Sequence, residues 1–162
     1  MSRGQTTWGD APGLYTPDQR ERRDRSKWTI VQGVLAPVQF LVFLISLALV
    51  LRYLLTGAGY EVATISILIK TGFLYLIMVT GAIWEKVVFG QYLLAPAFFW
   101  EDVVSFFVIA LHSLYLIVLA FDFLSPSGQM AIALAAYVLY VINAAQFILK
   151  LRQARLQAEA MA

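Results

Sequence analysis

The sequence has no cysteine and a single histidine, His112. The lack of cysteine excludes disulfides, thiolate nucleophiles, iron–sulfur clusters and cysteine-ligated zinc sites. A lone histidine also excludes a metal site built from several histidines of this chain. Charged residues are scarce as well, at 14% of the sequence, against about 25% in an ordinary soluble domain. The few ionisable groups that remain, mostly carboxylates and amines, are therefore informative.

Apolar residues, in contrast, make up 60% of the 162 positions. Because a membrane-spanning helix needs about 20 apolar residues, each of the four long apolar runs is long enough to cross a bilayer. The sequence predicts an all-α fold, an integral membrane four-helix bundle with no room for a separate soluble domain. The four predicted spans are residues 30–51, 62–84, 103–124 and 130–149.

The basic residues are distributed unevenly, and this predicts an orientation. Six of the twelve Lys and Arg residues lie before residue 28, Lys86 lies in the middle connection, and three follow the fourth span. Because cationic loops stay on the cytoplasmic side, both termini and the middle connection are expected to be cytoplasmic. The predicted domains are a polar cytoplasmic tail over residues 1–27, a transmembrane domain over 28–156 and a C-terminal tail over 157–162.

Polar residues inside the spans fall on common helix faces. In the third span, Glu101, Ser105 and His112 lie on one face, because they are separated by whole numbers of helical turns. Gln39 belongs to a polar seam in the first span, and Asn143 and Gln146 form a stripe in the fourth. Such residues either hold helices together by hydrogen bonds or mark a functional site, and the spacing alone leaves both open.

The middle connection, WEKVVFGQYLLAPAFFWEDV (residues 84–103), is apolar yet interrupted by Gly90 and Pro96. It is expected to lie at the membrane interface between the second and third helices. Glu101 and Asp102 then fall in the first turn of the third helix, where the helix dipole favours negative charge. Alternatively, neighbouring carboxylates covered by this apolar segment can differ in proton affinity, so that one acts as an acid.

Several segments carry a family resemblance: WTIVQG (28–33), IWEKVVFG (83–90), APAFFWED (95–102) and NAAQF (143–147). Together, over residues 22–156, the chain resembles the 3-vinyl (bacterio)chlorophyllide hydratases of bacteriochlorophyll biosynthesis, called 2-vinyl bacteriochlorophyllide hydratases in older naming. The resemblance implies a membrane hydro-lyase, a lyase that adds water to the 3-vinyl group of a magnesium chlorin to give a 3-(1-hydroxyethyl) group. It implies no cofactor, since magnesium comes with the substrate, and a location in the bacterial inner or intracytoplasmic membrane.

This reaction needs an acid, a base and a water-poor site. We expect Glu101 and Asp102 to be the acid and base, with Glu85 as the alternative acid. His112 is a candidate proton relay or axial ligand to the substrate magnesium; no metal site of the protein's own is expected. The expected substrate-binding residues are Lys86, Tyr92, Trp100, Ser105, Gln39, Asn143 and Gln146.

The expected partners are the chlorophyllide or bacteriochlorophyllide substrate, membrane lipid and other enzymes of bacteriochlorophyll biosynthesis, but not nucleic acid. A homodimer with the pigment between protomers is an open alternative. An alternative function is a non-catalytic membrane protein that binds tetrapyrroles or assists their assembly, which would use the same pocket without acid–base demands.

Overall fold

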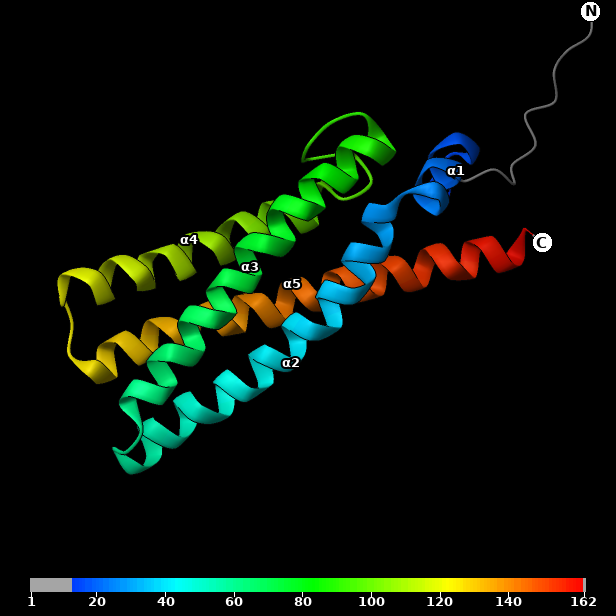
Figure 1. The fold of residues 1–162 in the computed structure, drawn as a ribbon. Helices are drawn as coiled ribbons and strands as arrows, with labels where there is room; N and C mark the ends of the chain where they lie inside the picture. Colours follow the sequence, from blue (N-terminus) through cyan, green and yellow to red (C-terminus); the bar gives the residue numbers. More distant parts are fainter. Residues whose placement is uncertain (1–12, 162) are drawn as a thin grey trace, which may run out of the picture.

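The computed structural model describes residues 13–161, and over this range it contains helices and no strand. Four of the helices are long and apolar enough to cross a membrane, which confirms the predicted all-α architecture. The elements, in chain order, are α1 (Pro17–Arg25), α2 (Lys27–Thr56), α3 (Tyr60–Phe89), α4 (Phe99–Phe121) and α5 (Pro126–Ala160) (Figure 1).

The four long helices form two antiparallel hairpins, α2–α3 and α4–α5. The hairpins also contact each other, through α2 with α5 and α3 with α4. Figure 1 shows both hairpin turns at one end of the bundle, and α1, the connection between α3 and α4 and the last turns of α5 at the other. The connection between α3 and α4, which is flanked by Glu85, Glu101 and Asp102, therefore lies at the end opposite to the two short turns. We call this end the acid-rich end.

Local sequence explains where the helices stop. α2 ends at Gly57 and α3 ends at Gly90, whose φ angles of 72° and 87° lie in the left-handed region that glycine tolerates. At the start of α5, the Ser125 side chain accepts a hydrogen bond from the Gly128 amide at 3.3 Å. α2, α3 and α5 extend beyond the apolar runs predicted for them at both ends. α4 begins before its predicted run, 103–124, but ends within it at Phe121, because Asp122 adopts a left-handed conformation.

The polar segment before the first span is partly helical, which the sequence reading missed. α1 begins with a capping box, in which Thr16 Oγ1 accepts from the Gln19 amide at 3.2 Å and Gln19 Oε1 accepts from the Thr16 amide at 2.9 Å. At the other end of the chain, Gln157 Oε1 accepts from the Leu14 amide at 3.2 Å. Residues 13–25 and the end of α5 thus form one structured layer; residues 1–12 lie outside the described range.

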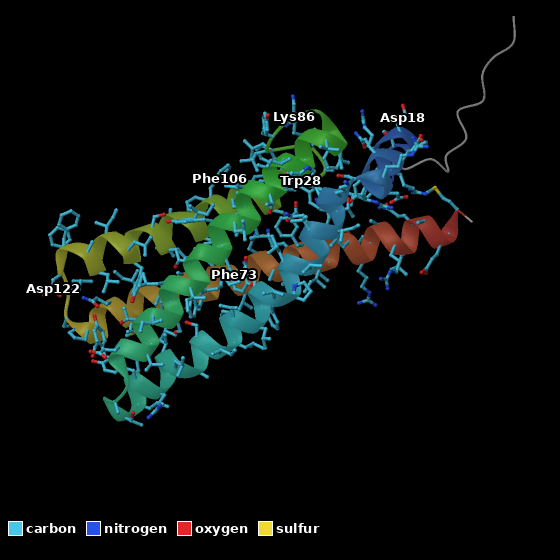
Figure 2. The ribbon with its side chains drawn as sticks, viewed as in Figure 1. Asp18, Trp28, Phe73, Lys86, Phe106 and Asp122 are labelled. Carbon is cyan, nitrogen blue, oxygen red and sulfur yellow. The ribbon has the colours of Figure 1, made fainter. Side chains whose placement is uncertain are left out.

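Two clusters of apolar side chains hold the bundle together. The larger one runs along the middle of the helices and includes Phe43, Ile67 and Tyr137. The smaller one lies at the acid-rich end, where Tyr15 and Phe98 pack with Val88 and are flanked by Trp84, Phe89 and Phe147. Figure 2 shows Asp18, Lys86 and Asp122 near the ends of the bundle and Phe73 and Phe106 between them, as expected for a protein surrounded by lipid.

Candidate active site

Three buried carboxyl groups lie where α3 ends and α4 begins. Glu85 lies one turn before the end of α3, and Glu101 and Asp102 lie in the first turn of α4, as predicted. Their exposed fractions are only 5%, 6% and 3%. Burial of a carboxylate is costly unless hydrogen bonds or an opposite charge compensate for it, so the partners of each group define its chemistry.

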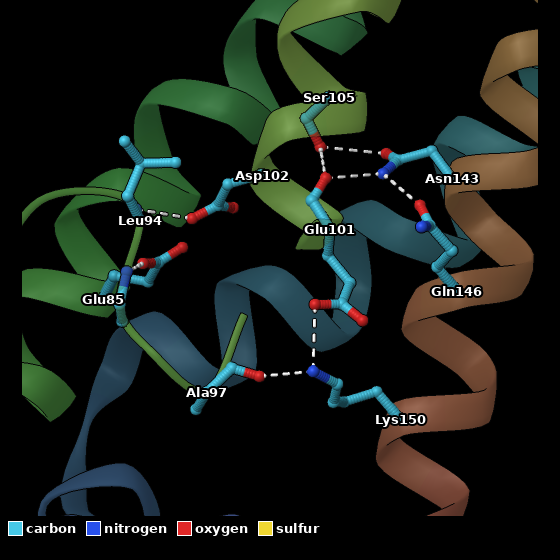
Figure 3. Close-up of polar contacts among 10 residues, drawn as sticks. Glu85, Leu94, Ala97, Glu101, Asp102, Ser105, Asn143, Gln146 and Lys150 are labelled. Atoms are coloured by element: carbon cyan, nitrogen blue, oxygen red, sulfur yellow. Dashed lines mark hydrogen bonds and ion pairs between the residues drawn. The ribbon is translucent and has the colours of Figure 1, made fainter. Parts of the chain in front are cut away.

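Glu85 and Asp102 are held by two consecutive backbone amides of the connection 90–98 (Figure 3). The Leu94 amide donates to Asp102 Oδ2 at 2.7 Å, and the Ala95 amide donates to Glu85 Oε2 at 3.3 Å. The two carboxyl groups are close enough for their charges to interact directly. Residues from two helices thus form a carboxyl pair beneath the connection, which we call the Glu85–Asp102 pair.

The backbone that holds this pair adopts an unusual conformation. Leu94 has a φ angle of 60°, in the left-handed region that costs a residue with a side chain about 1–2 kcal/mol. This conformation directs the Leu94 amide toward Asp102. Strained backbone of this kind persists only where the surroundings impose it, and it is frequent at functional sites.

Glu101 faces a different neighbour from Asp102. Lys150 Nζ, on α5, lies 3.0 Å from Glu101 Oε2 and donates to the Ala97 carbonyl oxygen at 2.6 Å. Consecutive residues of a helix point about 100° apart, so Glu101 points to α5 while Asp102 points to α3. The two residues expected to be acid and base are therefore neighbours in sequence, but the carboxyl group beside Asp102 is that of Glu85.

Ser105, Asn143 and Gln146 connect α4 to α5. Ser105 Oγ lies 2.8 Å from the Glu101 carbonyl oxygen and 3.0 Å from Asn143 Oδ1, and Asn143 Nδ2 donates to the same carbonyl at 2.8 Å. Gln146 Oε1 accepts a longer bond from Asn143 Nδ2 at 3.5 Å. In this conformation, most of the polar atoms of these expected substrate-binding residues are used in helix packing.

The outer side of the site presents aromatic rings. Tyr92 and Trp100 are 61% and 67% exposed. Lys86 Nζ donates to the Gly90 carbonyl oxygen at 2.8 Å, which caps α3, and lies 5.4 Å from the centroid of the Tyr92 ring. Two exposed aromatic rings and the exposed Lys86 therefore lie on or next to the connection that covers the Glu85–Asp102 pair.

Two of the predicted site residues lie deeper in the bundle. His112 follows Asp102 by ten residues, about 15 Å along the helix axis, and its ring centroid is 5.9 Å from that of Tyr137. Gln39 is also buried, in the middle of α2. Residues 13–161 contain no cluster of three or more His, Asp or Glu side chains suited to hold a metal ion. The predicted residues thus divide into a carboxylate site and a separate group near the bundle centre.

Lys150 is the contributor that the sequence reading did not assign to the site. It was visible as a cation at the end of the Asn143–Gln146 stripe, on the same helix face. The amides of Leu94 and Ala95 could not be anticipated, because their role depends on the fold of the connection and not on residue type.

Comparisons with known proteins agree on one family. Residues 15–153 match the family model described as 2-vinyl bacteriochlorophyllide hydratase (BCHF). The chain is 70% identical over 148 residues to the 2-vinyl bacteriochlorophyllide hydratase of Cereibacter sphaeroides, covering 91% of each chain. It is also 70% identical over 145 residues to the protein of the same name from Rhodobacter capsulatus, covering 90% of this chain and 84% of that one. No solved structure matches the chain.

Proposed function

Because the chain belongs to the 2-vinyl bacteriochlorophyllide hydratase family, we propose that it adds water to the vinyl group of a bacteriochlorophyllide at the Glu85–Asp102 pair. It is an enzyme of bacteriochlorophyll biosynthesis, a hydro-lyase embedded in the membrane by four helices. Every residue of the carboxylate site lies within the part of the chain that the family model covers. The observation that carries the assignment of the site is the buried carboxyl pair beneath residues 94 and 95.

The reaction dictates what the site must supply. A proton is added to the terminal vinyl carbon, the resulting cation is spread into the macrocycle, and water attacks the inner carbon and loses a proton. One proton is taken from an acid and one is returned to a base, so the sum is the addition of one water. A pair of carboxyl groups that exchange a proton performs both tasks without a further cofactor.

The Glu85–Asp102 pair suits this chemistry better than Glu101. Two buried carboxylates side by side repel each other when both are ionised, so the pair is most stable with one proton between them. Glu101, in contrast, forms an ion pair with the Lys150 ammonium at 3.0 Å. We therefore assign the acid and base roles to Glu85 and Asp102, and a positioning role to Glu101.

The macrocycle is proposed to lie against the exposed rings of Tyr92 and Trp100 at the membrane interface. Aromatic rings offer a flat apolar surface that matches a chlorin plane. Lys86, whose ammonium is exposed, is proposed to pair with the free propionate of the substrate. His112 is enclosed by the helices, with 1% of its surface exposed, so the substrate magnesium reaches it only if the helices separate. We propose that the reacting ring stays at the carboxylate site.

The charge distribution supports an orientation for this site. The basic residues of α1 and of the last turns of α5 lie at the same end of the bundle as the connection 90–98 (Figure 1). By the preference of cations for the cytoplasmic side, we propose that the carboxylate site opens toward the cytoplasmic face of the bacterial inner membrane.

The proposed function is tested with the purified full-length protein in detergent or nanodiscs and a vinyl bacteriochlorophyllide or vinyl chlorophyllide. We expect the vinyl-conjugated absorption to decrease and the product mass to increase by one water. Comparing the two pigments also determines which ring the enzyme prefers. A stable complex with unchanged pigment would contradict the proposal and favour a pigment-binding protein without catalysis.

A further inference from the structure

Lys70, in the middle of α3, is a buried cation that the proposed mechanism does not use. Its exposed fraction is 0%, and within residues 13–161 its ammonium has no hydrogen-bond acceptor. Nζ lies 3.7 Å from the centroid of the Tyr140 ring. A cation–π contact offsets only part of the cost of burying an ammonium in a membrane. An ionisable residue inside a membrane bundle normally marks a functional site.

Two further polar atoms near Lys70 are also without a partner among the described residues: His112 Nε2 and Gln39 Oε1. His112 Nδ1 lies 2.8 Å from the Val108 carbonyl oxygen. Because a carbonyl only accepts, Nδ1 must carry the proton, and Nε2 of the neutral ring is then an acceptor. Gln39 Oε1 is an acceptor too. One region therefore combines an unused donor with two unused acceptors.

These residues lie around the same part of α5, at Tyr137 and Tyr140, although they come from different helices. The Lys70 ammonium lies over the Tyr140 ring, and Phe43, one turn after Gln39 on α2, packs against the same ring at a centroid distance of 4.9 Å. Tyr137, which packs against the His112 ring, precedes Tyr140 by nearly one turn on α5. We refer to Gln39, Lys70, His112 and Tyr140, one from each membrane-spanning helix, as the Lys70 cluster.

The combination of donor and acceptors selects the ligand. An anion would pair with Lys70 but would be repelled by the lone pairs of His112 and Gln39. A metal cation would be bound by His112 but repelled by the ammonium of Lys70. Water accepts from Lys70 and donates to both other residues, and buried waters typically form about three such hydrogen bonds. We propose that the Lys70 cluster binds water in the middle of the membrane bundle.

The position of the cluster gives this water a role. Tyr140 lies nearly one turn from Asn143, which bonds to the Glu101 carbonyl oxygen and to Ser105. Buried polar side chains thus lead from the Lys70 cluster to Glu101, the neighbour in sequence of Asp102, and the reaction proposed at the Glu85–Asp102 pair consumes water. The cluster supplies the hydration site with its second substrate from within the protein. This role rests on the proposed hydratase function, whereas the binding of water does not.

The binding of water is tested by hydroxyl-radical footprinting of the full-length protein in nanodiscs, with radicals generated by brief X-ray exposure in ¹⁸O-labelled water. Bound water produces radicals locally, so Tyr140 should be labelled although it is buried. Met130, which belongs to the same apolar cluster with an exposed fraction of 0% against 6% for Tyr140 and is intrinsically more reactive, is the internal control. Labelling of Tyr140 that does not exceed labelling of Met130 would overturn the proposal.

Two variants test whether the water is bound by the side chains of the Lys70 cluster. Lys70→Met keeps the side-chain length but removes the donor, and Gln39→Leu removes one acceptor without altering a charge. Each should reduce Tyr140 labelling toward the level of Met130; full labelling in both would contradict the assignment.

The supply of water to the reaction is tested by kinetics. Lys70→Met should lower kcat and leave KM for the pigment unchanged. Unchanged kcat with lost labelling would overturn that role alone, and an inactive wild-type protein would instead contradict the hydratase function.

Discussion

Glu85, Glu101 and Asp102 are equally buried, yet each carboxyl group has a different partner. Asp102 and Glu85 accept single bonds from backbone amides, whereas Glu101 faces an ammonium. An amide stabilises a carboxylate less than a full positive charge does. The partners therefore separate two carboxyl groups that share neighbouring backbone amides from one that forms an ion pair.

This separation predicts a mild effect for Glu101→Gln. Glutamine retains the shape of the side chain and can accept a hydrogen bond from Lys150, so the connection should stay in place. We expect kcat to fall by less than about tenfold, equivalent to ~1.4 kcal/mol of activation free energy. The matched control is Glu61→Gln, at the exposed opposite end of α3, which should leave kcat unchanged. A loss of 100-fold or more for Glu101→Gln would place Glu101 among the residues that transfer protons.

Much of the residue-level site could be predicted from the sequence, but not the pairing. The acids next to tryptophans in residues 84–103 and the first-turn position of Glu101 and Asp102 follow from the pattern of apolar and polar residues. Which carboxyl groups face each other depends on helix rotation and on the left-handed conformation of Leu94. Neither leaves a periodic signal in the sequence.

At the scale of elements, the connection 90–98 is fixed from both sides. α3 and α4 hold it through Glu85 and Asp102, and α5 holds it through Lys150, which contacts both Ala97 and Glu101. The site thus depends on a helix that contributes no proposed catalytic group. A break in this contact should destabilise the α4–α5 hairpin and the connection together.

We therefore expect Lys150→Met to lower the free energy of unfolding by about 1–3 kcal/mol, because it leaves the Glu101 carboxylate without its charged partner. Denaturant-induced unfolding in detergent micelles measures this loss. Arg152→Met, two residues further along the same helix and exposed, is the control and should be close to neutral. The combination with Glu101→Gln should be less than additive, because the two side chains interact directly; full additivity would show that they do not.

The element boundaries show what hydropathy can and cannot predict. The four spans follow from apolar runs of sufficient length. α1 was missed because its residues are polar throughout, and its stability comes from the Thr16–Gln19 capping box and from packing of the preceding Tyr15 on Phe89 and Phe98. The last turns of α5 likewise extend past the apolar run and are held at Gln157 by Leu14.

At the scale of the whole molecule, the two ends of the bundle differ. One end carries the short turns at residues 57–59 and 122–125, and the other carries α1, the carboxylate site and the end of α5 (Figure 1). The basic residues concentrate at the second end, which predicts that it faces the cytoplasm.

Because the chain has no native cysteine, this orientation can be tested with single introduced cysteines. In intact cells whose outer membrane has been removed, a membrane-impermeant maleimide should label Ala58→Cys and Ser127→Cys. Gln91→Cys and Gln153→Cys should react only after the membrane is opened. The cysteine-free parent provides the background, and the reverse labelling pattern would invert the proposed topology.

Glu85 and Asp102 are proposed to act together as the acid and base of vinyl hydration. The most direct test is the kcat for formation of the 1-hydroxyethyl product by Glu85→Gln, Asp102→Asn and the double variant, in proteins with unchanged pigment binding. Each single variant should lose at least about 100-fold in kcat. The double variant should be hardly worse than the poorer single one, because the two groups work as a unit. Near-normal turnover by both single variants would show that Glu85 and Asp102 are not the acid and base.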